Sequence, residues 1–145
     1  MPIKQIACCT DFSENAEDAF KMALELTEKH GAKLYILHVL PPKMDYVIAS
    51  SEWIVQEPTE KSLILDLEER MQKDYGSRIS DNIEYEIIIL EGHISTEIIN
   101  FLKEKEIDLA VLGSYGLSGM GLVLFGSVAR RISNKAPCSI MIVRK

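Results

Sequence analysis

The stretch 109–127, LAVLGSYGLSGMGLVLFGS, decides the fold of this chain. It opens with four apolar residues, 109–112, which predict a short buried strand, and a loop with five glycines follows from Gly113 to Gly126. A helix is predicted next, over 128–135. A buried strand that leads through a glycine-rich loop into a helix is typical of α/β sheets, which bind ligands beyond the carboxyl ends of their strands.

The same order of strand, loop and helix repeats along the rest of the chain. Strands are predicted over 3–10, 33–40, 83–90, 109–112 and 139–143. Ser13 can cap a first helix, which Gly31 ends. Pro58 opens a second helix that ends near Gly76, and Ser95 can cap a third. Strict alternation predicts one α/β domain over residues 1–145, with a doubly wound five-stranded parallel sheet and helices on both faces.

The composition is that of a globular protein without a membrane segment. Of the 145 residues, 47% are hydrophobic and 26% are charged, and no apolar run approaches the ~20 residues of a membrane helix. No stretch resembles a signal peptide, so we expect a cytoplasmic location and no membrane partner. Cys8, Cys9 and Cys138 match neither a metal motif nor a CxxC pair, which favours buried free thiols. Adjacent strand residues point to opposite faces, so Cys8 and Cys9 are expected to diverge.

The charge is unevenly distributed. The net charge of −6 argues against nucleic-acid binding, which needs dense Lys and Arg. Residues 1–108 hold all 22 acidic residues and 11 of the 16 basic ones, whereas residues 109–145 hold five basic residues and no acid. The acid-free quarter would suit a small anionic ligand, and a solvated basic helix face would produce the same pattern.

The glycine loop has the chemistry of a phosphate site. Glycines let backbone N–H groups approach a ligand, and the start of the following helix adds unpaired donors and a partial positive charge. The loop lacks GxxxxGK[ST], and the end of the first strand lacks GxGxxG, so neither a P-loop nor a dinucleotide site is expected. A tight, flexible connection is the alternative that the residues leave open.

The spacing Gly113-x2-Gly116-x9-Gly126-Ser127 resembles the ATP-binding motif of the universal stress protein family. Three other segments are similar to that family: Thr10-Asp11-Phe12-Ser13, His38-Val39 and Ala136-Pro137-Cys138. The resemblance covers nearly the whole chain. It implies the strand order 3-2-1-4-5 of the adenine nucleotide alpha hydrolase-like fold, in which the first and fourth strands are neighbours.

The resemblance also implies a nucleotide site for ATP, or for ADP or AMP, with Mg possible as a metal. The residues implied are Thr10, Asp11, Val39, Leu112, Gly113, Gly116, Gly126, Ser127, Val128 and Ala129. Asp11 would meet the ribose hydroxyls or the metal ion, and the backbone of Val39 would meet the adenine. Gly113 would border the ribose, and the remaining loop glycines, the Ser127 hydroxyl and the helix-end amides would hold the phosphates.

These features favour a nucleotide-dependent switch or stress-response factor over an enzyme. His30, His38 and His93 have no triad or metal spacing, and Arg130 and Arg131 are weak candidates to assist phosphoryl transfer. A slow ATPase and a dimeric interaction scaffold without nucleotide are the alternatives. Similarity to the family implies a homodimer through the last strand, Ser139–Val143. The segment 41–57 has no clear period, and its Trp53 could cover the pocket or serve in packing.

Overall fold

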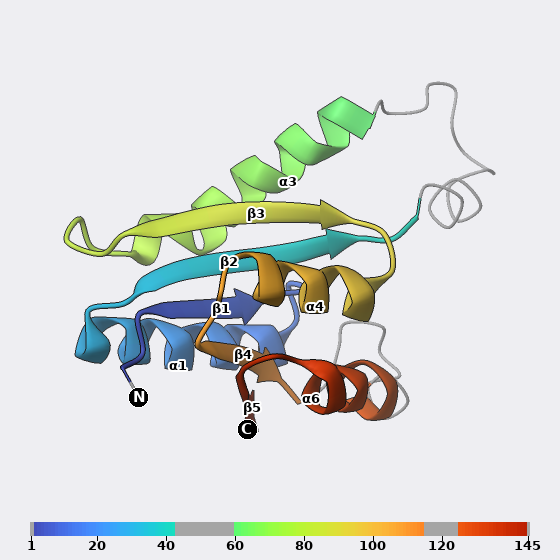
Figure 1. Cartoon of the computed structure of the whole chain (residues 1–145). Coiled ribbons are helices and arrows are strands. Elements are labelled where there is room, and N and C mark those ends of the chain that lie inside the picture. The colour runs from blue at the N-terminus through green and yellow to red at the C-terminus, as the bar shows by residue number, and fades with distance from the viewer. Residues whose placement is uncertain (1, 43–59, 115–124, 145) are drawn as a thin grey trace.

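Five parallel strands form the middle layer of the structure (Figure 1). The computed structural model describes residues 2–42, 60–114 and 125–144. The strands are β1 (Gln5–Cys9), β2 (Lys33–Leu40), β3 (Tyr85–Glu91), β4 (Leu109–Gly113) and β5 (Ser139–Val143). Their order in the sheet is β3-β2-β1-β4-β5, with every pairing parallel, so the predicted order and fold class are confirmed.

Strand β1 lies in the centre of the sheet and is apolar on both faces. Its Cys8 pairs with Ile36 of β2 on one side and with Val111 of β4 on the other. The side chains of Ile6, Ala7 and Cys8 are completely buried. Burial on both faces is what a continuous apolar strand requires, and it is possible here because helices cover the sheet from two sides.

Helix α1 (Glu14–His30) begins and ends where the sequence predicts. The Ser13 hydroxyl accepts a hydrogen bond from the Ala16 amide at 3.1 Å, which satisfies one donor of the first turn. Gly31 ends the helix in the left-handed conformation, with φ of 62°, and its N–H bonds the Thr27 carbonyl. Both capping predictions are confirmed.

The other described helices are α3 (Glu60–Asp74), the 3-10 turn Gly76–Arg78, α4 (Ile94–Glu104), the π-helical turn Phe125–Ala129 and α6 (Arg130–Lys135). The predicted cap of α4 was wrong, because His93 occupies the N-cap and Ser95 lies inside the helix. The Ser95 side chain is buried, and its hydroxyl bonds Nδ1 of His93 at 3.3 Å instead of a helix amide. Pro58 and Trp53 lie outside the described residues. None of the helices in the described ranges is long and apolar enough to cross a membrane.

The helices cover the two faces of the sheet in pairs (Figure 1). On one face, α1 and α3 pack through residues that include Phe20 and Met71. On the other face, α4 and α6 pack through residues that include Ile98 and Ile132. Each pair therefore buries its own apolar cluster against the sheet, and the doubly wound arrangement follows.

The thiols divide between the two clusters. Cys8 belongs to the α1 and α3 side, whereas Cys9 packs on the α4 and α6 side, so the two side chains diverge as expected. Burial, and to a smaller extent Cys138, raises the pKa of Cys9 to about 12. Burial also raises the pKa of Cys8 and Cys138. All three residues are free cysteines, as predicted, but only Cys8 is fully buried, whereas Cys9 and Cys138 are half-buried.

Gly31→Ala is expected to destabilise the protein by about 1–2 kcal/mol. A Cβ at this position meets no atom within 4 Å, so the whole cost arises from the left-handed backbone. Gly31→Asn is the matched control, because asparagine tolerates this conformation better, and it should lose less stability. Urea denaturation measures both changes; equal stability of Gly31→Ala and the parent protein would contradict the prediction.

Candidate functional site

A pocket opens at the carboxyl ends of the central strands, where the chain leaves β1 and β4. Its cavity volume is about 160 Å³. The direction of winding reverses between these two strands, and sheets of this kind take ligands at such a point. The pocket therefore lies where the sequence predicts a ligand site.

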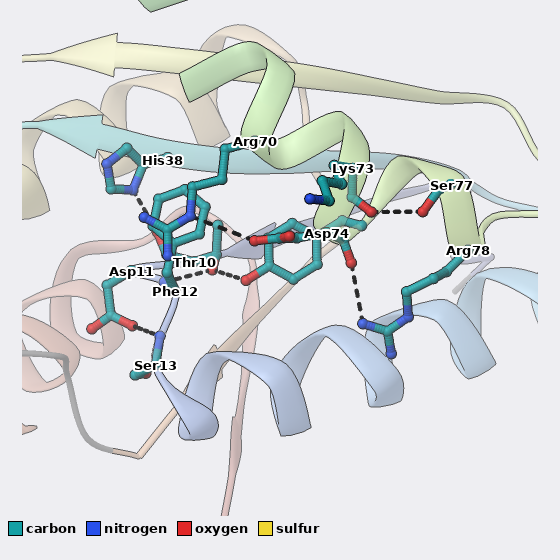
Figure 2. Close-up of polar contacts among 11 residues, drawn as sticks. Thr10, Asp11, Phe12, Ser13, His38, Arg70, Lys73, Asp74, Ser77 and Arg78 are labelled. Atoms are coloured by element: carbon teal, nitrogen blue, oxygen red, sulfur yellow. Dashed lines mark hydrogen bonds and ion pairs between the residues drawn. The ribbon is translucent and has the colours of Figure 1, made fainter. Parts of the chain in front are cut away.

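The polar side of the pocket is the turn that follows β1. The Thr10 amide donates to the Leu37 carbonyl at 2.8 Å, so the end of β1 stays joined to β2. Oδ1 of Asp11 accepts a hydrogen bond from the Ser13 amide at 3.0 Å and closes an Asx turn (Figure 2). Thr10 is buried, whereas Asp11 is half-buried and lines the pocket.

Gly113 and Ser114 enter the pocket from the end of β4. A Cβ on Gly113 would lie 2.6 Å from the carbonyl oxygen of Asn15, so α1 approaches this strand too closely for any side chain. The Ser114 amide donates to the Val143 carbonyl at 3.1 Å, and its side chain is buried. The glycine at this position is therefore required by the packing of α1, whatever ligand the pocket takes.

An apolar wall completes the pocket, and sequence reasoning did not identify most of it. Lining residues that were not predicted are Cys9, Ala16, Leu37, His38, Ile94, Ile98, Ser114 and Ile132. Ile94 and Ile98 are one helical turn apart on α4, and this spacing was a signal that could have placed them on one face. Such a wall suits a flat apolar group such as a nucleobase.

His38 lines the rim of the pocket and holds the turn after β1. Its Nδ1 lies 2.8 Å from the Thr10 carbonyl; because a carbonyl only accepts, Nδ1 carries the proton (Figure 2). Burial lowers the pKa of His38 below its usual value and exceeds the opposing effects of the Thr10 carbonyl and Asp11. The Arg70 guanidinium lowers this pKa further. At neutral pH the imidazole is therefore in its neutral form.

The predicted site residues divide into those at the pocket and those outside it. The pocket is lined by Thr10, Asp11, Val39, Leu112, Gly113, Val128 and Ala129. Ser127 is exposed and is not among the lining residues. Gly126 lies in the π-helical turn that leads to α6, and Gly116 lies outside the described residues. Residues from four segments of the sequence thus meet in one place, and their roles stay a prediction.

The basic residues of the acid-free quarter do not reach this pocket in the described part of the chain. Arg130 and Arg131 are exposed. Arg131 lines a separate groove between α4 and α6, together with Lys103 and Lys135. Among the described residues, no three His, Cys, Asp or Glu side chains gather as a metal-binding group.

The fold and the pocket together define a class, the doubly wound α/β domains that take a ligand where two strand-end loops diverge. The chain belongs to the universal stress protein family, because the model of that family matches residues 2–144. It is 31% identical to universal stress protein YxiE of Bacillus subtilis, over 92% of this chain and 94% of that protein. It is 29% identical to universal stress protein MJ0531 of Methanocaldococcus jannaschii, over 98% of this chain and 82% of that protein.

Solved structures share the whole fold. Protein MJ0577 of Methanocaldococcus jannaschii is similar with a TM-score of 0.76, at 23% identity over 100% of this chain and 98% of that chain. The fold is therefore adenine nucleotide alpha hydrolase-like, as expected. A universal stress protein from Archaeoglobus fulgidus, solved with dAMP, has a TM-score of 0.67 at 22% identity over 98% of both chains. One from Arabidopsis thaliana, solved with AMP, has a TM-score of 0.64 at 16% identity over 98% of this chain and 92% of that chain.

His38 is expected to make the protein less stable as the pH falls. In the unfolded chain its pKa is about 6.5, and in the folded protein burial lowers it. The unfolded state therefore binds more protons between these two values, so stability falls as the pH drops through about 6.5 and levels off below the folded pKa. Urea denaturation of the parent protein and His38→Gln from pH 7.5 to 5 should give a smaller loss in the variant.

His30→Gln is the control for this measurement, because His30 is exposed at the end of α1. It should keep the pH dependence of the parent protein. An identical slope in His38→Gln and the parent would contradict the assignment of this titration to His38.

Proposed function

We propose that this protein binds an adenine nucleotide, ATP with Mg²⁺, in the strand-end pocket and acts as a nucleotide-dependent switch or stress-response factor. One observation carries the proposal: Asp11, Val39, Gly113 and Val128, far apart in the sequence, line the same pocket. Relatives solved with AMP and dAMP, and a universal stress protein solved in complex with cAMP, support the choice of an adenine nucleotide.

The apolar wall is the proposed place for the adenine. Leu37, Val39 and Ile98 line the pocket from two elements, and burial of a base against them removes apolar area from water. The Val39 backbone lies at the end of β2, where it can exchange hydrogen bonds with the edge of the base. Base and wall together would supply most of the affinity for the nucleoside part.

Asp11 is the proposed contact for the ribose hydroxyls or for the metal ion. Its carboxylate lines the pocket, and its Oδ1 accepts the hydrogen bond of the Ser13 amide. Mg²⁺ commonly binds one or two carboxylates together with substrate phosphates and water, so a single aspartate at this place fits the ion. The metal would neutralise phosphate charge near Asp11.

The phosphates are proposed to lie at the helical stretch that leads to α6. Val128 and Ala129 line the pocket within the π-helical turn Phe125–Ala129. Helix starts carry unpaired N–H donors, and π-helical turns are frequent at functional sites. Gly116, Gly126 and Ser127 are the further phosphate contacts implied by the motif.

Calorimetric titration of ATP with Mg²⁺ into nucleotide-stripped protein tests this function. We expect micromolar binding, because a buried base adds to charge-assisted contacts. Asp11→Asn should weaken binding about tenfold or more, since it removes the charge that meets the hydroxyls or the metal. Gly126→Val should also weaken it, because a branched side chain would block the approach of phosphate to the backbone.

Asp81→Asn is the matched control, because Asp81 is an exposed aspartate outside the pocket and its loss changes the net charge equally. It should bind as the parent protein does. Absence of binding in the parent would contradict the proposed function. Steady phosphate release that Asp11→Asn abolishes would favour the slow ATPase over the switch.

The last strand is proposed to pair with a second copy of the chain. Within the described residues, β5 pairs only with β4, and its apolar side chains are partly exposed. Such an edge readily pairs with another strand unless something covers it. A twofold antiparallel pairing of Ser139–Val143 would cover both edges at once.

Sedimentation at micromolar concentration tests this pairing, and a dimer is expected. Ile142→Lys should produce a monomer, because a charge on an edge strand opposes pairing. Ile142 lies outside both core clusters, so the fold should persist. Leu65→Lys, on the exposed surface of α3, is the control and should stay dimeric. A monomeric parent protein would contradict the proposal.

A further inference from the structure

Phe12, next to Asp11, has a backbone conformation that is rare for an aromatic residue. Its φ is 66°, in the left-handed region that glycine and asparagine favour. Phe12 lies between Asp11 and Ser13, whose hydrogen bond closes the Asx turn. The conformation of Phe12 therefore fixes where the Ser13 amide lies relative to the Asp11 carboxylate, which accepts its hydrogen bond.

Contacts on the α3 side offset the cost of this conformation. The Arg70 guanidinium lies over the Phe12 ring, with its Cζ 3.8 Å from the ring centroid (Figure 2). The ring also stacks on Tyr75, at 6.3 Å between centroids, and meets His38 at 4.9 Å. Strained residues of this kind persist where their surroundings over-determine them, and they are concentrated at functional sites.

A second line of contacts ties the same turn to α3. The Phe12 amide donates to the Thr10 hydroxyl oxygen at 3.0 Å, and this hydroxyl also bonds the Tyr75 hydroxyl. Tyr75 follows α3 directly and is buried. Arg70 is itself oriented by Asp74, whose carboxylate lies 3.5 Å from its Nε (Figure 2). Both residues that flank Asp11 are thus held by groups of α3 or of its end.

We propose that Arg70 is a positioning residue for the nucleotide site, which acts on Asp11 by clamping Phe12 in its left-handed conformation. The inference rests on the proposed nucleotide binding for its functional consequence. Arg70 does not line the pocket, so it acts through the turn. Because coupling between two sites is reciprocal, a nucleotide held by Asp11 would in turn stabilise the docking of α3.

The competing explanation is that Arg70 forms an ordinary surface cation–π contact. Its side chain is 54% exposed, and such contacts at exposed sites contribute little. A contact of that kind would stabilise the fold in general and would not act through Asp11. The two explanations therefore differ in whether loss of Arg70 affects the turn around Asp11 specifically or the stability of the whole fold.

Amide hydrogen exchange of the ligand-free protein, read by NMR, is the first arm of the test. Arg70→Gln should speed exchange at Phe12 and Ser13 about two- to five-fold, because their amides bond Thr10 and Asp11 within the clamped turn. Lys73→Gln removes the same charge from an exposed position on α3 and should leave these rates unchanged. Unchanged rates in Arg70→Gln, or equal acceleration in both variants, would overturn the inference.

Calorimetry with ATP and Mg²⁺ is the second arm. Arg70→Gln should weaken binding about two- to five-fold, whereas Lys73→Gln should not. In the Asp11→Asn background the Arg70 substitution should have no further effect, because the carboxylate through which it acts is gone. Equal weakening in both backgrounds would overturn the inference and leave the nucleotide function standing. A parent protein that binds no nucleotide would refute the proposed function, and the exchange arm would still decide the role of Arg70.

Discussion

Burial of β1 between two parallel neighbours is the constraint on which the rest of the structure depends. Its apolar side chains need cover on both faces, and its backbone needs partners at both edges, so β2 and β4 must flank it. The chain can reach both neighbours only by winding first in one direction and then in the other. A pocket then lies at the carboxyl ends of β1 and β4 without any dedicated element. The site is a consequence of the topology.

The turn after β1 has to serve two faces of the sheet at once. Asp11 lines the pocket, to which α4 and α6 contribute Ile94, Ile98 and Ile132, whereas Phe12 packs against the cluster of α1 and α3. Consecutive residues of an extended chain already point to opposite faces, and the left-handed backbone of Phe12 lies in the turn that leads from β1 into α1. Gly113 meets a related constraint on the neighbouring strand, where the Asn15 carbonyl leaves no room for a Cβ. Part of the sequence motif thus reflects packing, and only the remainder is free to reflect a ligand.

Local signals in the sequence predicted the helices and strands. The features that the sequence did not predict depend on contacts between residues far apart in the chain. Ser13 and Gly31 act on neighbouring amides and carbonyls, so they marked the ends of α1 correctly. Ser95 is also a residue type that favours N-caps. His93 nevertheless occupies the N-cap, and the Ser95 side chain is buried. Ile94 and Ile132 entered the pocket wall from helices that meet only in the folded chain. Arg70 and Phe12 are separated by most of the sequence between β1 and β3, and no periodic pattern predicts their contact.

The charges around the pocket indicate how a nucleotide would be selected. Among the described lining residues there is no Lys or Arg, and three cations, Lys103, Arg131 and Lys135, line a different groove. Phosphate charge would therefore be met by backbone amides and a metal ion. The base, buried against an apolar wall, would dominate affinity. Relatives solved with AMP, dAMP and cAMP are consistent with a dominant role of the base, since these ligands share the adenine and differ in sugar and phosphate. Discrimination among adenine nucleotides would then depend on the glycine-rich segment after β4 and on the direction of the Asp11 carboxylate.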